Sequence, residues 1–146
     1  MKKNGFTLLE MLIVLSAISI LSVVTYFNLS SIYEKQKIDQ FINQFSQDIL
    51  FMQQSAVSHR NRHTLRWFTN QAKYSITSSG GTDPVLVLVR YYPSDIQVNL
   101  NTFPNPMTYG ADGNINRGGT IIVSYKTKTY YIVFQLGRGR FTYYEV

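Results

Sequence analysis

Apolar residues are concentrated near the start of the chain. Residues 6–27 (FTLLEMLIVLSAISILSVVTYF) contain one charged side chain, Glu10, and no proline or glycine. An apolar run of about 20 residues is long enough to cross the hydrocarbon core of a bilayer as an α-helix. We therefore expect residues 6–27 to form a transmembrane helix.

The helical pattern continues beyond Phe27 with a different character. One apolar stripe, mostly at spacings of three and four, consists of Ile38, Phe41, Ile42, Phe45, Ile49, Met52 and Ala56. Such spacing is typical of a helix that buries one face, and Asp39 and Asp48 are expected on its polar side. Because no proline precedes Pro84, the pattern predicts a continuous helix over 6–58, roughly 80 Å long at 1.5 Å per residue.

Beyond Arg62 the pattern changes to short strand-like runs separated by turn residues. The expected strands are Thr64–Phe68, Ala72–Thr77, Val85–Tyr91, Ile96–Leu100, Thr120–Tyr125, Thr129–Leu136 and Arg140–Glu145. Residues 79–84 and 112–119 are expected to be turns or loops. Many strands without a second helix predict an α+β fold. In it, the amphipathic half of one long helix, residues 28–60, packs on a pair of antiparallel sheets formed by residues 61–146.

Composition adds two constraints. The 146 residues include no cysteine, which excludes disulfides and thiolate chemistry. The net charge of +6 is unevenly placed, since the chain from Val57 onward carries ten Lys and Arg against four Asp and Glu. This basic part would suit a polyanion or an acidic partner, or serve as a solubilising surface.

The N-terminus differs from an ordinary secretory signal. Lys2 and Lys3 precede the apolar run, which favours a cytoplasmic start and an extracytoplasmic C-terminal domain. Glu10 costs several kcal/mol in hydrocarbon unless it is paired or protonated. Its partner must come from another chain or from a new charge, such as the α-ammonium created by cleavage between Gly5 and Phe6.

The string KKNGFTLLEMLIVLSAISIL resembles the class III signals of type IV pilins and type II secretion pseudopilins. The resemblance implies that residues 1–5 are a leader, that a prepilin peptidase cuts after Gly5, and that Phe6 is then N-methylated. It also implies that Glu10 pairs with the N-terminal amine of a neighbouring subunit. The expected partners are major and minor pilins, a membrane assembly platform, a separate ATPase motor, and lipid before assembly.

A second resemblance covers the C-terminal third. The segment YGADGNINRGGTIIVSYKTKTYYIVFQLGRGRF is similar to the end of the GspH/FimT-like minor pseudopilin domain, through Gly113, Gly118, Gly119, Thr120, Gly137, Gly139 and Arg140. The overall likeness is to minor pilins of Gram-positive competence pili. It implies a structural subunit, held in the cell membrane and then in a surface filament for DNA uptake. The alternatives are a type II secretion pseudopilin, a DNA-binding or adhesive tip subunit, and an unprocessed membrane-anchored domain.

Enzymatic and metal chemistry lack support in the sequence. His59 and His63, which we expect to be exposed, could share one helical face if the helix extends that far. Arg60 and Asn61, however, follow His59 where a zinc protease needs glutamate. The spacing of Asp112, Asn114 and Asn116 is that of a calcium loop, but Arg117 replaces its glycine. We interpret that segment as an Asx-rich turn, and we expect no metal, no cofactor and no catalytic residue.

Direct contact with DNA is a further hypothesis from the basic C-terminal part. Cations and aromatic residues occur together around His59–Phe68 and near the C-terminus, as in non-specific DNA binders. Alternating aromatics in strands also form ordinary cross-strand pairs. The residues to test are Arg60, Arg62, Arg66, Lys126, Lys128, Arg138 and Arg140.

Overall fold

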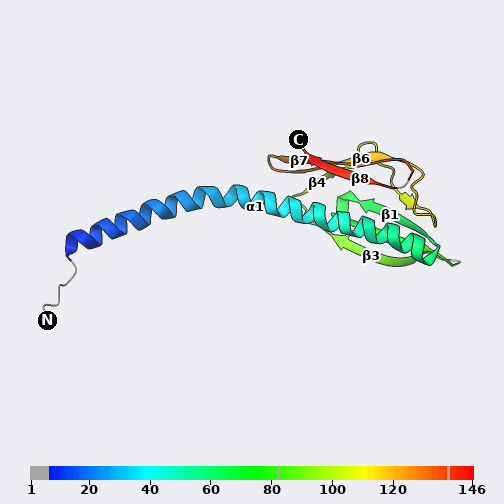
Figure 1. Ribbon diagram of the computed structural model, residues 1–146, viewed down its shortest axis with the longest axis horizontal. Helices are drawn as coiled ribbons and strands as arrows, with labels where there is room; N and C mark the ends of the chain where they lie inside the picture. Colours follow the sequence, from blue (N-terminus) through cyan, green and yellow to red (C-terminus); the bar gives the residue numbers. More distant parts are fainter. Residues whose placement is uncertain (1–6, 82, 138) are drawn as a thin grey trace. The chain divides into compact units, whose positions relative to one another are not determined.

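Among the residues that the structure describes, one long helix is followed by eight strands. The computed structural model describes residues 7–81, 83–137 and 139–146, without the side chains of residues 24–31. Helix α1 spans Leu8–His59, so the predicted continuous helix is confirmed over these residues (Figure 1). The chain divides into two compact units, Met1–Gln36 and Lys37–Val146, and the first 29 residues of α1 belong to the former.

The C-terminal end of α1 is closed by backbone hydrogen bonds rather than by a glycine. The amide of Arg60 donates to the carbonyl of Val57 (3.3 Å), and the amide of Asn61 donates to that of Ala56 (3.1 Å). Arg60 adopts a left-handed conformation with φ of 52°. This is the Schellman arrangement, which satisfies carbonyls that the last helical turn leaves unpaired. It ends the helix at His59, so His59 and His63 do not share a helical face.

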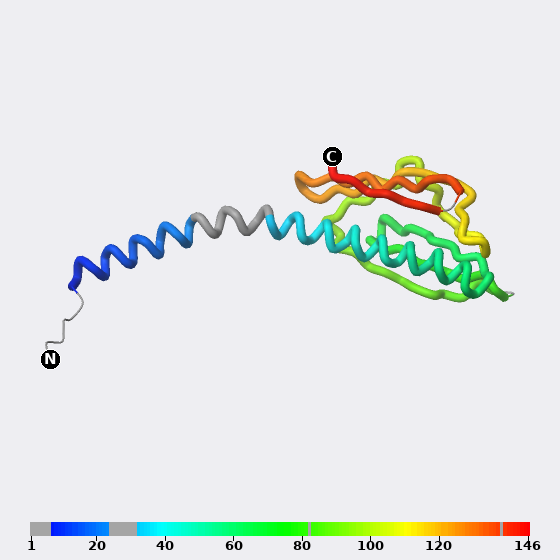
Figure 2. The backbone as a smooth tube through the Cα atoms, viewed as in Figure 1, coloured from blue at the N-terminus to red at the C-terminus, as the bar shows by residue number. Residues whose placement is uncertain are grey.

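The strands form two antiparallel sheets, as predicted, and each sheet has four strands. The first sheet has the order β3-β2-β1-β5, with the strands β1 Arg62–Phe68, β2 Lys73–Ser79, β3 Val85–Tyr91 and β5 Met107–Tyr109. The second has the order β4-β6-β7-β8, with the strands β4 Gln97–Asn99, β6 Gly119–Tyr125, β7 Lys128–Phe134 and β8 Phe141–Glu145. Figure 2 shows β7 and β8, in orange and red, running side by side to the C-terminus. A short 3-10 helix, η1 Thr69–Gln71, joins β1 to β2.

The core of the domain joins the helix to both sheets. Every residue of the predicted stripe from Ile38 to Ala56 is buried, which confirms that prediction. These side chains share one cluster with the inward-facing residues of β1, β2, β6 and β7. At its centre, the Phe45 ring contacts Trp67, Tyr74 and Phe134, with ring centroids 5.0, 5.3 and 6.4 Å away. The domain therefore carries its own hydrophobic core between Ile38 and Phe134.

Strand β5 was not predicted, because its three residues have proline on one side and too short an alternation to recognise. Its register places Met107 opposite Leu65 of β1. Beyond that point the side chain of Asn105 replaces a strand. Its Oδ1 accepts from the amide of Trp67 (3.0 Å), and its Nδ2 donates to the carbonyl of Trp67 (3.1 Å). The edge of β1 is thus covered by a tertiary contact that no local pattern indicates.

Candidate functional site

The first candidate site is the start of α1. Thr7 caps the helix, because its Oγ1 accepts from the amide of Glu10 (3.3 Å), and its carbonyl also lies 3.1 Å from that nitrogen. Glu10 lies in the first turn, where the helix dipole favours a carboxylate. Its side chain is exposed in the single chain. Gly5 and Phe6, the predicted cleavage residues, lie outside the described residues.

The helix around Glu10 presents an apolar surface on all sides. The large apolar side chains from Leu8 to Val23 are between 49 % and 80 % exposed in the single chain. Serines within this segment are satisfied internally, since Ser16, Ser19 and Ser22 each donate to a carbonyl three or four residues earlier at 2.8 Å. Such back-bonding removes the cost of a free hydroxyl in apolar surroundings. This surface is therefore suited to burial against other apolar groups.

Across the residues that the structure describes, no helix combines the length and the apolarity needed to cross a membrane. Phe6, at the start of the expected span, and the side chains of residues 24–31, around its end, are outside that description.

The predicted DNA-contact residues fall into separate groups. Arg60 follows the helix, whereas Arg62 and Arg66 point outward from β1. Lys126 and Arg140 lie beyond opposite ends of β7, in the turns that join it to β6 and β8. Lys128 forms an ion pair with Glu145, and Arg138 lies outside the described residues.

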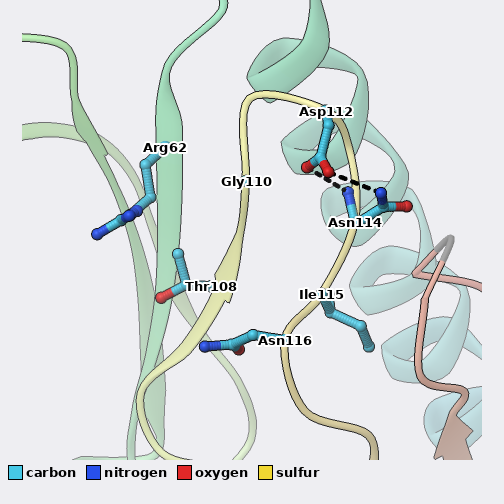
Figure 3. Close-up of a pocket in the computed structure, with 7 residues that line it drawn as sticks. All are labelled: Arg62, Thr108, Gly110, Asp112, Asn114, Ile115 and Asn116. Atoms are coloured by element: carbon cyan, nitrogen blue, oxygen red, sulfur yellow. Dashed lines mark hydrogen bonds between the residues drawn. The ribbon is translucent and has the colours of Figure 1, made fainter.

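A cavity of about 400 Å³ lies beside Arg62 of β1 (Figure 3). Its lining consists of Arg62, Thr108, Gly110, Asp112, Asn114, Ile115 and Asn116. Asp112 turns back on its own loop, because its two carboxylate oxygens accept from the backbone amide (3.1 Å) and the side-chain amide (2.7 Å) of Asn114. These hydrogen bonds lower the pKa of Asp112. The segment is the Asx-rich turn that the sequence predicted.

Histidine and carboxylate side chains do not gather around a metal site in the described part of the chain, where no group of three or more such ligands was found. His63 was expected to be exposed, but only 2 % of it is accessible, and its Nδ1 donates to the carbonyl of Asn61 (3.2 Å). The prediction of two exposed histidines was therefore wrong for His63. The alternation of β1 turns its side chain inward.

The sequence also misplaced Asp48, which was assigned to the polar face of the helix and is 4 % exposed. Its carboxylate accepts from the hydroxyl of Tyr74 (2.7 Å), from Nε of Arg90 (3.0 Å) and from Nε2 of Gln44 (3.1 Å). Asp48 lies three residues after Phe45 and next to Ile49, so its place within the stripe could have revealed its burial. Its partners Tyr74 and Arg90 come from β2 and β3 and could not be read from the sequence.

These features define a class of protein. The model of the prokaryotic N-terminal methylation motif matches residues 1–26. The minor pseudopilin EpsH of the type 2 secretion system of Vibrio cholerae has the same fold, with a TM-score of 0.62 and 10 % identity over 74 % of this chain and 96 % of that one. The type IV minor pilin FimU of Pseudomonas aeruginosa gives a TM-score of 0.61 and 11 % identity over 75 % and 89 %. The class is that of pilin-like subunits with a methylation motif and a helix packed on antiparallel sheets.

Sequence similarity to competence protein ComGD of Bacillus subtilis (strain 168) narrows the class. The two chains are 32 % identical over 139 residues, which cover 95 % of this chain and 92 % of the relative. The chain belongs to the type IV pilin and pseudopilin family, as a minor pilin-like subunit homologous to ComGD. It is therefore a structural subunit rather than an enzyme, as predicted. Membership implies a precursor that is held in the membrane and processed before it assembles with other pilins.

Proposed function

We propose that this chain is a minor pilin of a competence pilus, required to assemble the filament through which cells take up DNA for transformation. The observation that supports this role is the similarity to competence protein ComGD over nearly the whole length of both chains. The fold agrees, because a helix with an exposed apolar surface is joined to a domain with its own core. The first can be buried among other helices while the second remains folded in water.

Processing is the first step of this function. A prepilin peptidase cuts between Gly5 and Phe6, and Phe6 is N-methylated. The matched methylation motif over residues 1–26 supports this proposal. Before the cut, residues 6–27 hold the precursor in the cell membrane with its C-terminal domain outside. After it, the same apolar residues pack among the helices of major and minor pilins.

Glu10 sets the position of each subunit within the filament. Cleavage creates an α-ammonium four residues before Glu10 along the chain. In the assembled filament, the carboxylate pairs with the amine of a neighbouring subunit. Burying either charge alone costs several kcal/mol. Apolar packing thus supplies most of the association free energy, and the ion pair selects one register.

Other proteins supply the energy and the platform for assembly. No nucleotide-binding motif is found in the sequence. A separate ATPase motor and a membrane assembly platform therefore move the subunit from the lipid into the filament.

Gene deletion tests the competence role. We would delete the gene, restore it from a plasmid, and measure both uptake of labelled DNA and secretion of folded proteins. The proposal expects loss of uptake with normal secretion, and recovery on complementation. Normal uptake with defective secretion would instead assign the subunit to a type II secretion system.

A further inference from the structure

The outer face of the first sheet gathers three cations. Arg62 and Arg66 alternate outward along β1, and Lys73 begins β2 opposite Phe68. The two arginines are four positions apart, so their Cα atoms lie about 13 Å apart along the strand at 3.3 Å per residue. We call the outward side chains of β1, β2 and β3 the basic face.

The cations of the basic face have no anionic partner among the described residues, unlike several cations elsewhere in the domain. Lys37 pairs with Asp95, Arg90 with Asp48, and Lys128 with Glu145. Asp112 lines the same cavity as Arg62, but the two form no ion pair in the described part of the chain. The positive charge of the basic face therefore remains available to an external anion.

Aromatic rings flank one of these cations. The register aligns Phe68, Lys73 and Tyr91 in one row across β1, β2 and β3. The Lys73 Nζ lies 5.2 Å from the ring centroid of Phe68 and 5.8 Å from that of Tyr91. Tyr91 is 74 % exposed. Lys73 can thus contact one anion, and the half-buried ring of Phe68 and the exposed ring of Tyr91 provide apolar surface on either side of it.

Small hydroxyl side chains occupy the middle of the basic face. Ser75 lies opposite Arg66, and Thr77 lies opposite Thr64. Neither a large side chain nor a negative charge therefore lies between the arginines and the row of Phe68, Lys73 and Tyr91. No carboxylate occurs within β1, β2 or β3. An extended chain of phosphates could therefore cross the strands without meeting a repulsive group on them.

We propose that the basic face binds single-stranded nucleic acid. Arg62, Arg66 and Lys73 contact phosphates, while unpaired bases stack on Tyr91 and Phe68. Exposed aromatic rings on a sheet are a general means of holding unpaired bases, and neighbouring cations follow the backbone. Trp67, which the sequence had grouped with these residues, is buried and takes no part. This binding is additional to filament assembly and does not depend on the competence role.

Equilibrium binding of a labelled poly-thymidine oligonucleotide tests the proposal. We would use the full chain in non-ionic detergent and compare two matched pairs of variants, after confirming their folding by circular dichroism. Arg62→Gln with Arg66→Gln is matched by Lys35→Gln with Arg117→Gln, which removes two exposed cations that lie outside the basic face. Tyr91→Ala is matched by Tyr144→Ala, which removes an exposed ring from the second sheet.

We expect the Arg62/Arg66 variant to bind about tenfold more weakly at low salt. Its logarithmic salt slope should fall by about 1.4, which corresponds to two phosphate contacts with a single strand. Tyr91→Ala should lose about five- to a hundredfold affinity, and both control variants should stay within about twofold of the parent.

Three outcomes would overturn the proposal. The parent chain fails to bind the oligonucleotide, or the controls weaken binding as much as the variants of the basic face. In the third outcome, a duplex or a base-free polyphosphate binds as tightly as the oligonucleotide, and Tyr91→Ala does not change the affinity. That result would show that the face binds polyanions without stacking of bases. None of these outcomes bears on DNA uptake by the deletion strain, so the two proposals fail independently.

Discussion

At the scale of single residues, the two carboxylates of α1 differ in how they are stabilised. Asp48 is buried and receives donors from its own helix and from β2 and β3. The side chain of Glu10 is exposed in the single chain, and it lies in the first turn of α1, where the helix dipole stabilises a negative charge. A carboxylate in apolar surroundings without a donor is costly. Glu10 is therefore the residue whose partner we place on another subunit.

Replacing Glu10 with Gln should leave cleavage intact but reduce filament incorporation at least tenfold. The change removes the charge that pairs with the neighbouring amine while it keeps the size of the side chain. Immunoblots of sheared filaments and of membranes measure the incorporated and the processed protein. Glu34→Gln, the same change further along α1, is the control and should incorporate normally. Normal incorporation of Glu10→Gln would refute the assigned role.

Buried tyrosines make the stability of the domain sensitive to alkali. Burial, strengthened by the hydrogen bond to Asp48, raises the pKa of Tyr74, and burial raises the pKa of Tyr109. Above about pH 10, the unfolded chain loses phenolic protons that the folded domain keeps. The free energy of unfolding should therefore be unaffected by these groups below that pH. Above it, the free energy should fall by about 1.4 kcal/mol per pH unit for each tyrosine.

Urea unfolding at a series of alkaline pH values tests this dependence. Tyr74→Phe should reduce the slope by the contribution of one proton, because phenylalanine cannot ionise. A slope that is unchanged in Tyr74→Phe, or a stability that stays constant above about pH 10, would contradict the assignment.

At the scale of elements, close contacts between backbones decide where strands can pass. Gly119 begins β6, and a Cβ at this position would lie 2.6 Å from both the carbonyl oxygen of Thr102 and the Cα of Phe103. Phe103 is itself buried against Phe134, with ring centroids 4.9 Å apart. The loop before β5 is thus packed directly on the first residue of β6, and only glycine fits without a shift of the backbone.

Gly119→Ala should destabilise the domain by about 1–3 kcal/mol, the usual cost of forcing an extra carbon into a packed site. Chemical unfolding monitored by circular dichroism measures this change. Gly81→Ala is the matched control, because no described atom apart from its chain neighbours lies within 4 Å of its added carbon. Its effect should stay within about 0.5 kcal/mol. Equal stability of the two variants would show that the chain at Thr102 and Phe103 moves aside readily.

At the scale of the whole molecule, the two units differ in how their apolar residues are buried. The unit Lys37–Val146 buries a hydrophobic core within itself, from Ile38 to Phe134. The described apolar residues of the first unit have no such cover in the single chain. The division of the chain thus separates a part that folds by its own burial from a part that needs external burial.

The fragment Lys37–Val146 should therefore fold by itself and unfold cooperatively. A fragment that begins at Ser46 lacks Ile38, Phe41, Ile42 and Phe45, which are all buried. Their burial is worth about 1.5–3 kcal/mol each, a sum comparable to the total stability of a small domain. Thermal unfolding and near-ultraviolet circular dichroism should show a folded longer fragment and an unfolded shorter one. A folded shorter fragment would contradict this account of the core.

Local patterns in the sequence determined the helix, the main strands and the N-terminal motif. A stripe at helical spacing and runs such as Val85–Tyr91 report which face of an element avoids water, so they can be read without knowing the partner. The string around Gly5, Phe6 and Glu10 indicated the family because its residues are consecutive, so the motif can be recognised without knowledge of the fold.

Only the tertiary structure decided which distant residues meet. The burial of Asp48 depends on Tyr74 and Arg90, and the edge of β1 depends on Asn105, far along the chain. The sheet order brought Tyr91 beside Lys73 and separated Lys126 from Arg140. Such contacts arise from strand register and helix packing, which depend on the whole core at once, and no local spacing encodes them.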